Sequence, residues 1–133
     1  MGDLSATGPH RRGAPARTAA ERPQRGRWSD AHAYAALDLG TNNCRLLIAR
    51  PSGQHFTVID AFSRIVRLGE GLAATNRLSD AAIERTLAAL RICADKLKRR
   101  RVTLARSVAT EACRRAVNGP EFIARAHRET GIH

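Results

Sequence analysis

The stretch that most constrains the fold covers residues 34–50 and reads YAALDLGTNNCRLLIAR. Two apolar runs flank a short polar segment, residues 40–43, and this pattern predicts two strands joined by a tight turn. Because both flanks are almost continuously apolar, we expect strands that are covered on both faces. Asp38 stands near the end of the first strand, and Arg45 stands near the start of the second.

The residue types of this hairpin suit a phosphate group. Gly40 lets the backbone come close to a ligand, and the polar residues after it add hydrogen-bond donors. Arg45 supplies a charged fork that matches phosphate oxygens. The lone carboxylate of Asp38 fits there if it holds a hydrated divalent cation or orients water. The candidate phosphate-binding residues are Asp38, Gly40, Thr41, Asn42, Asn43 and Arg45. The alternative is an ordinary hairpin, with an Asn-Asn turn and a solvated arginine.

Charge and cysteine content narrow the class of protein. The chain has 133 residues, enough for one domain or part of one, and a formal net charge of +11. This balance favours an anionic partner but does not distinguish phosphate polymers, nucleotides and nucleic acid. No apolar run approaches the roughly 20 residues that span a bilayer. The three cysteines lack any short pairing or metal spacing, which indicates buried free thiols in a reducing compartment, the cytoplasm.

Residues 1–32 form an extension rich in Ala, Gly, Pro and Arg. They contain too few apolar side chains to offset the entropy of ordering, so we expect a disordered basic tail. No apolar core of a secretory signal is present. An organellar transit peptide and weak contact with nucleic acid are the alternatives.

Residues 51–53, Pro-Ser-Gly, predict a turn, and residues 54–66 predict a third strand, which completes an antiparallel meander. A loop with the sequence LGEG follows, residues 68–71. Its glycines suit left-handed backbone, and we leave open whether it faces the site. Ser79 then starts the clearest helix as an N-cap. This helix ends in a basic run, residues 96–101, which is either a solvated cap or a polyanion-binding surface.

Residues 102–109 predict a fourth strand, parallel to a neighbour after a right-handed crossover. A short helix over 110–116 opens at its C-terminal end, where open α/β sheets bind ligands. The free N–H groups of that helix and the guanidinium of Arg114 suit an anion. The alternative is that Glu111 caps the helix while Arg114 is simply exposed. A last helix begins at Gly119, and its expected buried residues are Phe122, Ile123 and Ala126.

Four motifs occur in order: DxGTNxxR, RxVRLGEGL, LSxxAIxRTxxAL and ATEACRRAxNGxEF. Their combination, over about residues 34–132, resembles the N-terminal part of the exopolyphosphatase/guanosine pentaphosphate phosphohydrolase (Ppx/GppA) family. The resemblance implies an α/β fold of ribonuclease-H-like type, as in actin and sugar kinases. The expected unit is an N-terminal half-domain with the order β-β-β-α-β-α. Residues 33–133 would be a truncated first domain.

By position, the resemblance assigns phosphate binding to the hairpin residues given above and to Arg114. It implies Mg²⁺-assisted attack of water on a terminal phosphoanhydride of inorganic polyphosphate or guanosine pentaphosphate, with Asp38 as an indirect metal contact. A membrane partner is not implied, nucleic acid is disfavoured, and a full-length member is compatible with a homodimer. The expected location is cytoplasmic.

The family's catalytic base, in an EEAR segment, and its second phosphate loop, DxGGGSxE, would follow residue 132 and are not in this sequence. We therefore expect an N-terminal fragment with no catalytic residue of its own, inactive alone and prone to aggregate along its last strand. One alternative is a module that binds phosphate or another polyanion without chemistry. Another is half of a sugar kinase or chaperone-like ATPase, since those families share DxGT.

Overall fold

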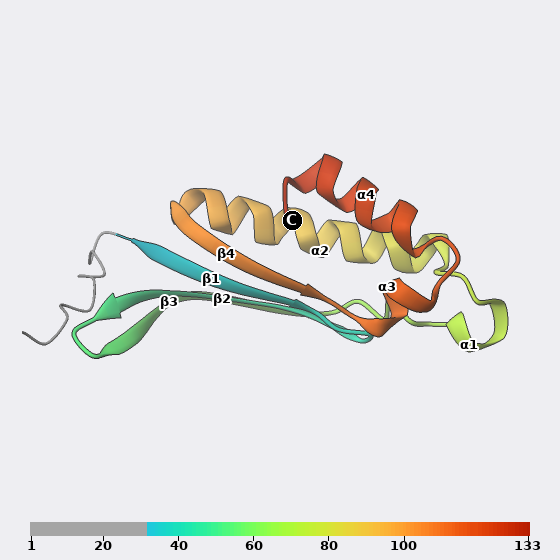
Figure 1. The fold of residues 1–133 in the computed structure, drawn as a ribbon, viewed down its shortest axis with the longest axis horizontal. Coiled ribbons are helices and arrows are strands. Elements are labelled where there is room, and N and C mark those ends of the chain that lie inside the picture. Colours follow the sequence, from blue (N-terminus) through green and yellow to red (C-terminus); the bar gives the residue numbers. More distant parts are fainter. Residues whose placement is uncertain (1–31) are drawn as a thin grey trace, which may run out of the picture.

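The computed structural model describes residues 32–133, which form one four-stranded sheet with two longer helices on one of its faces (Figure 1). The predicted tail lies, apart from His32, outside the described residues. The elements are β1 (Ala33–Leu39), β2 (Asn43–Ser52), β3 (His55–Ile65), α1 (Leu72–Thr75), α2 (Asp80–Arg99), β4 (Val102–Ala109), α3 (Glu111–Arg115) and α4 (Gly119–Thr130).

The sheet has the strand order β3-β2-β1-β4. β1, β2 and β3 form the predicted antiparallel meander, and β4 pairs with β1 in parallel and occupies an edge. Two local predictions were wrong. β2 continues through Pro51 and Ser52, so the turn lies at Gly53, where φ is +60°. A one-turn helix, α1, follows the glycine-rich loop and was not predicted.

Only one face of the sheet is covered. Along β1 and β2 buried and exposed residues alternate, so the expectation of strands covered on both faces was wrong. Leu37 and Cys44 face the helices, whereas Asp38 and Arg45 face the other side. The strand register places several exposed large apolar side chains on that open face: Leu47, Phe56, Val58, Ile65, Leu104 and Val108.

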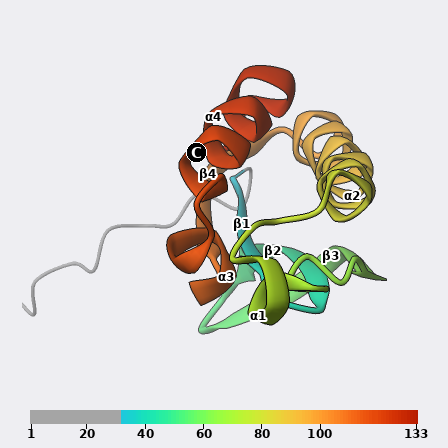
Figure 2. The same cartoon turned by 90° about the vertical axis from the view of Figure 1, so that its right-hand side faces the viewer.

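The core lies between the sheet and α2 and α4 (Figure 2). As predicted, Ser79 caps α2, and its Oγ accepts a hydrogen bond from the Ala82 N–H at 3.2 Å. Leu87 and Leu90 of α2 and Phe122 of α4 are buried in this layer. Ile123 is 42% exposed, so its predicted burial was wrong. Within residues 32–133 no helix is long and apolar enough to cross a membrane.

Asn118 fastens the link between α3 and α4 to the start of α2. Its Oδ1 accepts from the Leu78 N–H at 2.8 Å, and its Nδ2 donates to the Leu78 carbonyl at 2.9 Å. The next residue, Gly119, sits so close to α3 that a Cβ there would lie 1.8 Å from the Cys113 carbonyl oxygen. Glycine is therefore required at that contact.

Candidate functional site

The turn between β1 and β2 is held by backbone hydrogen bonds. The Gly40 N–H donates to the Asn43 carbonyl at 2.8 Å, which closes the turn. The Asn42 carbonyl accepts from the N–H groups of Val66 and Arg67, at 2.7 and 3.0 Å. These two bonds tie the turn to the chain that leaves β3, so its shape is fixed from outside as well as from within.

The glycine-rich loop after β3 lies directly against this turn. The Gly69 N–H donates to the Thr41 carbonyl at 3.1 Å. A Cβ at Gly69 would lie 2.3 Å from Thr41 Cγ2, so only glycine fits without displacing the threonine. Gly71 has a φ of +74°, as predicted, whereas Gly69 has no positive φ, so the left-handed backbone predicted for it was wrong.

The β1–β2 turn meets the junction between β4 and α3. Thr41 Oγ1 and Thr110 Oγ1 form a hydrogen bond of 2.7 Å. The meeting follows from topology, because β1 and β4 are parallel neighbours and end beside each other, Leu39 opposite Ala109. The carboxyl ends of neighbouring parallel strands are where open α/β sheets bind ligands. The β1–β2 turn and the start of α3, whose residue types both suit an anion, therefore meet at this edge of the sheet.

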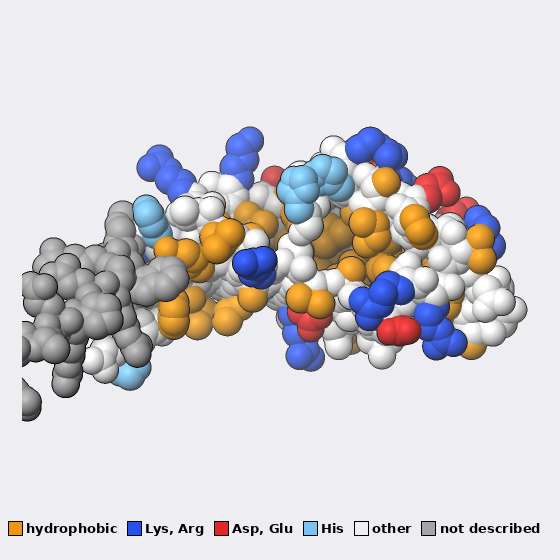
Figure 3. Space-filling view, viewed as in Figure 1, with side chains coloured by type: hydrophobic (Ala, Val, Ile, Leu, Met, Phe, Trp, Pro, Cys, Tyr) orange, Lys and Arg blue, Asp and Glu red, His pale blue; other side chains and the backbone are white. Residues whose placement is uncertain are grey.

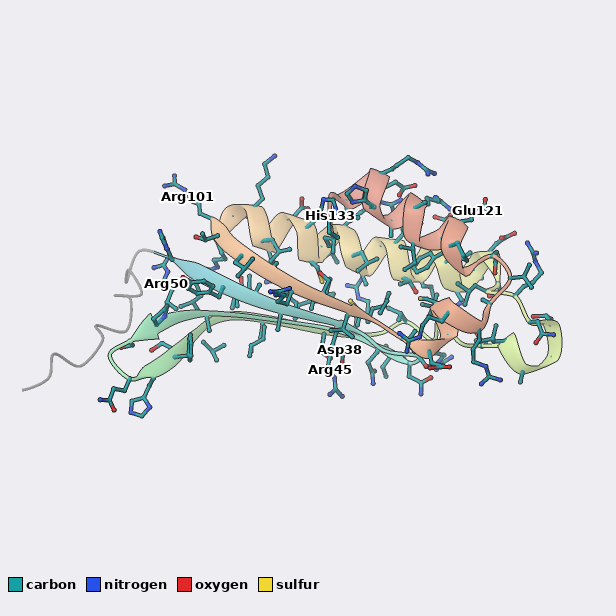
Figure 4. All side chains as sticks on the ribbon, in the orientation of Figure 1. Asp38, Arg45, Arg50, Arg101, Glu121 and His133 are labelled. Carbon is teal, nitrogen blue, oxygen red and sulfur yellow. The ribbon has the colours of Figure 1, made fainter. Side chains whose placement is uncertain are left out.

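Asp38 and Arg45 lie side by side on the open face of the sheet. They are directly opposite each other in the β1–β2 register and both side chains are exposed (Figure 4). Neither forms an ion pair with another described residue. Both line a shallow hollow of about 440 Å³, which Ser63 of β3 also lines. One carboxylate and one guanidinium are therefore both available to a ligand.

Arg114 does not line that hollow. Its guanidinium donates to Glu111 Oε2 at 3.2 Å, and both side chains are about two-thirds exposed. Thr110, not Glu111, caps α3, because Thr110 Oγ1 accepts from the Ala112 N–H at 3.3 Å. In the alternative interpretation, the capping role of Glu111 was therefore wrong, while the exposure of Arg114 was right. The start of α3 reaches the turn, while Arg114 is held by its neighbour on the same helix.

Cys113, beside Arg114, is buried, and burial raises the pKa of its thiol. A neutral buried thiol is a poor nucleophile, so it adds no covalent chemistry to this edge.

The expected Mg²⁺ would contact the protein through Asp38. The described residues contain no cluster of three or more groups that would form a metal cage. Mg²⁺ commonly binds through one or two carboxylates together with water and substrate phosphates. Asp38 alone on the open face fits a metal ion that arrives with a phosphate ligand, and does not fit a preformed structural site.

A larger hollow, of about 570 Å³, lies elsewhere, between α2, β4 and the C-terminal residues. Hydrophobic side chains gather on this side of the molecule, along β4 and beneath α4 (Figure 3). None of the residues predicted to bind phosphate lines it. Size alone therefore does not identify the candidate site, and we assign the site from its chemistry.

Two contributors were missed at the sequence level. Thr110 was treated only as the start of a helix, although a threonine that directly follows a parallel strand is a recognisable signal. Ser63 carried no signal, because its place opposite Arg45 depends on the β2–β3 register.

Comparisons with known proteins agree with this architecture. The sequence model of the Ppx/GppA phosphatase family matches residues 47–133, a range that begins after Arg45. A solved Ppx/GppA family member from Aquifex aeolicus is 35% identical, with a TM-score of 0.73, over 76% of this chain and 33% of that one. An exopolyphosphatase-like protein is 34% identical with a TM-score of 0.71, over 77% and 31%.

An exopolyphosphatase from Cytophaga hutchinsonii is 25% identical, with a TM-score of 0.72, over 76% of this chain and 32% of that one. The chain thus spans about a third of the length of these proteins. They have the actin-like ATPase fold, which confirms the predicted fold class. From the family match and these likenesses together, the chain belongs to the Ppx/GppA phosphatase family.

Proposed function

We propose that this chain forms one phosphate-contacting wall of a hydrolase that cleaves terminal phosphoanhydride bonds of inorganic polyphosphate, guanosine pentaphosphate or both. The observation that carries the proposal is the contact between Thr41 and Thr110, which joins two anion-suited segments at the carboxyl ends of parallel strands. Family membership supports phosphatase chemistry in the parent protein. The choice of these two substrates rests on the motifs that the sequence shares with that family.

In this proposal the residues of the chain bind and orient. Backbone and side-chain donors of residues 40–43 hold phosphate oxygens, and Arg45 neutralises part of their charge. Asp38 holds a water molecule, or the water shell of Mg²⁺; the ion, when bound, stabilises charge on the transferring phosphoryl group. Arg114 joins the site once a polyanion competes with Glu111 for its guanidinium.

The chain by itself is proposed to be inactive. Asp38 is the only carboxylate that lines the open-face hollow among the described residues. In this proposal Asp38 is already engaged with the metal ion or its water and is not free to act as the general base. A second carboxylate is needed as general base. The three free, buried cysteines of the described chain support a cytoplasmic location.

Calorimetric measurement of tripolyphosphate binding to the chain tests whether these residues form a phosphate-binding wall. Arg45→Ala should weaken binding about 10- to 100-fold, since a charge-assisted hydrogen bond contributes roughly 1.5–3 kcal/mol. Arg50→Ala is the matched control, because Arg50 is an exposed arginine of the same strand at its far end (Figure 4). Equal losses in both variants would refute a specific phosphate wall.

Phosphate release from polyphosphate with Mg²⁺ tests the inactivity separately. We expect none from the isolated chain, and metal-dependent release that is lost in Asp38→Asn would overturn that part of the proposal.

The second candidate is a basic module that binds polyanions without chemistry. The basic tail and the basic run at residues 96–101 motivate it, and the structure weakens the second, because Lys96 and Arg100 are paired with Asp60 at 2.8 and 3.0 Å. Salt-dependent binding that survives both Arg45→Ala and Arg114→Ala, yet is lost on removal of residues 1–30, would favour it.

A further inference from the structure

Two of the three cysteines meet inside the core, where the phosphate site makes no use of them. Cys44 Sγ, on β2, lies 3.9 Å from Cys93 Sγ, on α2. Both residues are fully buried and both are free thiols. The third cysteine, Cys113, is a free thiol buried in α3.

From this contact we infer that Cys44 and Cys93 form a dithiol site that peroxide-class oxidants convert reversibly into a disulfide between β2 and α2. A disulfide requires an S–S distance of about 2.05 Å, so the two sulfurs must approach by about 1.9 Å. Rotation about χ1 of either side chain is the motion available to them.

The two thiols have different roles. Either thiol can donate in the contact between the two sulfurs. With Cys93 as the donor, this hydrogen bond lowers the pKa of Cys44 and outweighs the opposing effect of burial. The hydrogen bond and burial raise the pKa of Cys93. Because the thiolate is the reactive form, Cys44 is the first nucleophile and Cys93 resolves the product.

Hydrogen peroxide is the oxidant in the reaction that forms the disulfide. The Cys44 thiolate attacks a peroxide oxygen, so an S–O bond forms, the O–O bond breaks, and water leaves after protonation. The Cys93 thiol then attacks the sulfur of the sulfenic acid; the S–S bond forms and the second water leaves. The two thiols lose two electrons and two protons, and the peroxide is reduced to two waters.

The positions of Cys44 and Cys93 determine which parts of the fold the disulfide would connect. Cys44 directly follows Asn43, the last residue of the candidate phosphate turn, and Cys93 lies in the C-terminal half of α2, which covers the sheet. Since both sulfurs are buried, a bulky oxidant such as glutathione disulfide is excluded, while peroxide enters during local opening. The disulfide would fix the start of β2 to α2.

Peroxide treatment of the native 133-residue chain, followed by alkylation and peptide mapping, tests the inference. We expect a monomer that has lost two hydrogen atoms in mass, an intramolecular 44–93 cross-link, and a free Cys113. The thermal midpoint should rise by roughly 10 °C and return after treatment with dithiothreitol. Cys113→Ser should keep the cross-link, while Cys44→Ser and Cys93→Ser should abolish it.

A denatured sample serves as the internal control, since oxidation in urea should scramble the three cysteines. If the native chain also gives mixed pairings, intermolecular disulfides, or sulfinic acid at Cys44 with Cys93 untouched, the inference is wrong. The wild-type mapping decides the matter even where a serine variant fails to fold.

Discussion

Thr41 and Thr110 share a hydrogen bond of 2.7 Å although 69 residues separate them in the sequence. Thr41 belongs to the turn between β1 and β2, and Thr110 caps α3. The bond therefore connects a hairpin with a helix start, and it depends on β4 lying beside β1. Substitutions at the two hydroxyls measure how strongly the candidate site is preorganised.

Thr41→Val removes the shared hydrogen bond and should lower the free energy of unfolding by about 0.5–1 kcal/mol. Thr110→Val also removes the cap of α3 and should cost about 1–2 kcal/mol. The double variant should cost less than the two single changes added together, because they share one bond. Urea denaturation gives these values, with Thr103→Val, an exposed change on β4, as the control. Strict additivity would show that the bond is absent in solution.

Gly69→Ala should destabilise the chain by about 1–3 kcal/mol, since its new methyl group would lie 2.3 Å from Thr41 Cγ2. The second change Thr41→Ser removes Cγ2 while it keeps the hydroxyl, so it should restore most of the lost stability. Thermal unfolding of the two single variants and the double variant tests this. A double variant as unstable as Gly69→Ala alone would place the strain elsewhere.

Stability at low pH should depend on Asp60. Hydrogen bonds from Lys96, and then from Arg100, lower the pKa of this carboxyl to about 2. Its ordinary value in an unfolded chain is about 3.9. The contribution of Asp60 is therefore complete above about pH 4 and is lost as the pH falls toward 2. Urea denaturation between these limits should show a steep decline that Asp60→Asn flattens.

Asp95→Asn is the control for this experiment, because Asp95 lies on the same helix and forms no ion pair with another described residue. An identical decline in Asp60→Asn and the parent chain would mean that the Asp60 cluster does not form.

The open face of the sheet should make the isolated chain self-associate. Val58 and Leu104 are more than half exposed on that face, and exposed apolar surface beside an edge strand favours aggregation. Val58→Lys and Leu104→Lys should each raise the concentration at which association begins, as followed by light scattering. Ile123→Lys adds the same charge on α4 and should have little effect. The reverse order would locate the contact on the helices.

Local patterns predicted most of the elements because short-range rules decide them. Ser79 starts α2 as a side-chain cap, and Gly131 ends α4 with a φ of +71°, as their residue types indicate. The parallel position of β4 followed from the helix that precedes it. The turn at Gly40 was predicted for the same reason, since no other described element has to be known to recognise it.

The features that the sequence could not predict depend on contacts between residues that are far apart along the chain. Alternation in β1 was hidden because Ala36 is small and apolar yet lies on the open face. Ile123 was assigned to the core by its hydrophobicity, but Phe122 and Ala126 are the side chains of α4 that lie in the buried core. Arg114 was placed at the site by position, and its pairing with Glu111 became visible only from side-chain geometry.

The carboxamide of Asn118 satisfies both backbone groups of Leu78, forty residues earlier. It therefore closes a ring without a covalent bond, and α2, β4 and α3 lie within that ring. Closing a loop of this length costs chain entropy before any contact stabilises it. We expect the two hydrogen bonds between Asn118 and Leu78 to form late in folding. Their formation should therefore limit the folding rate of the whole unit.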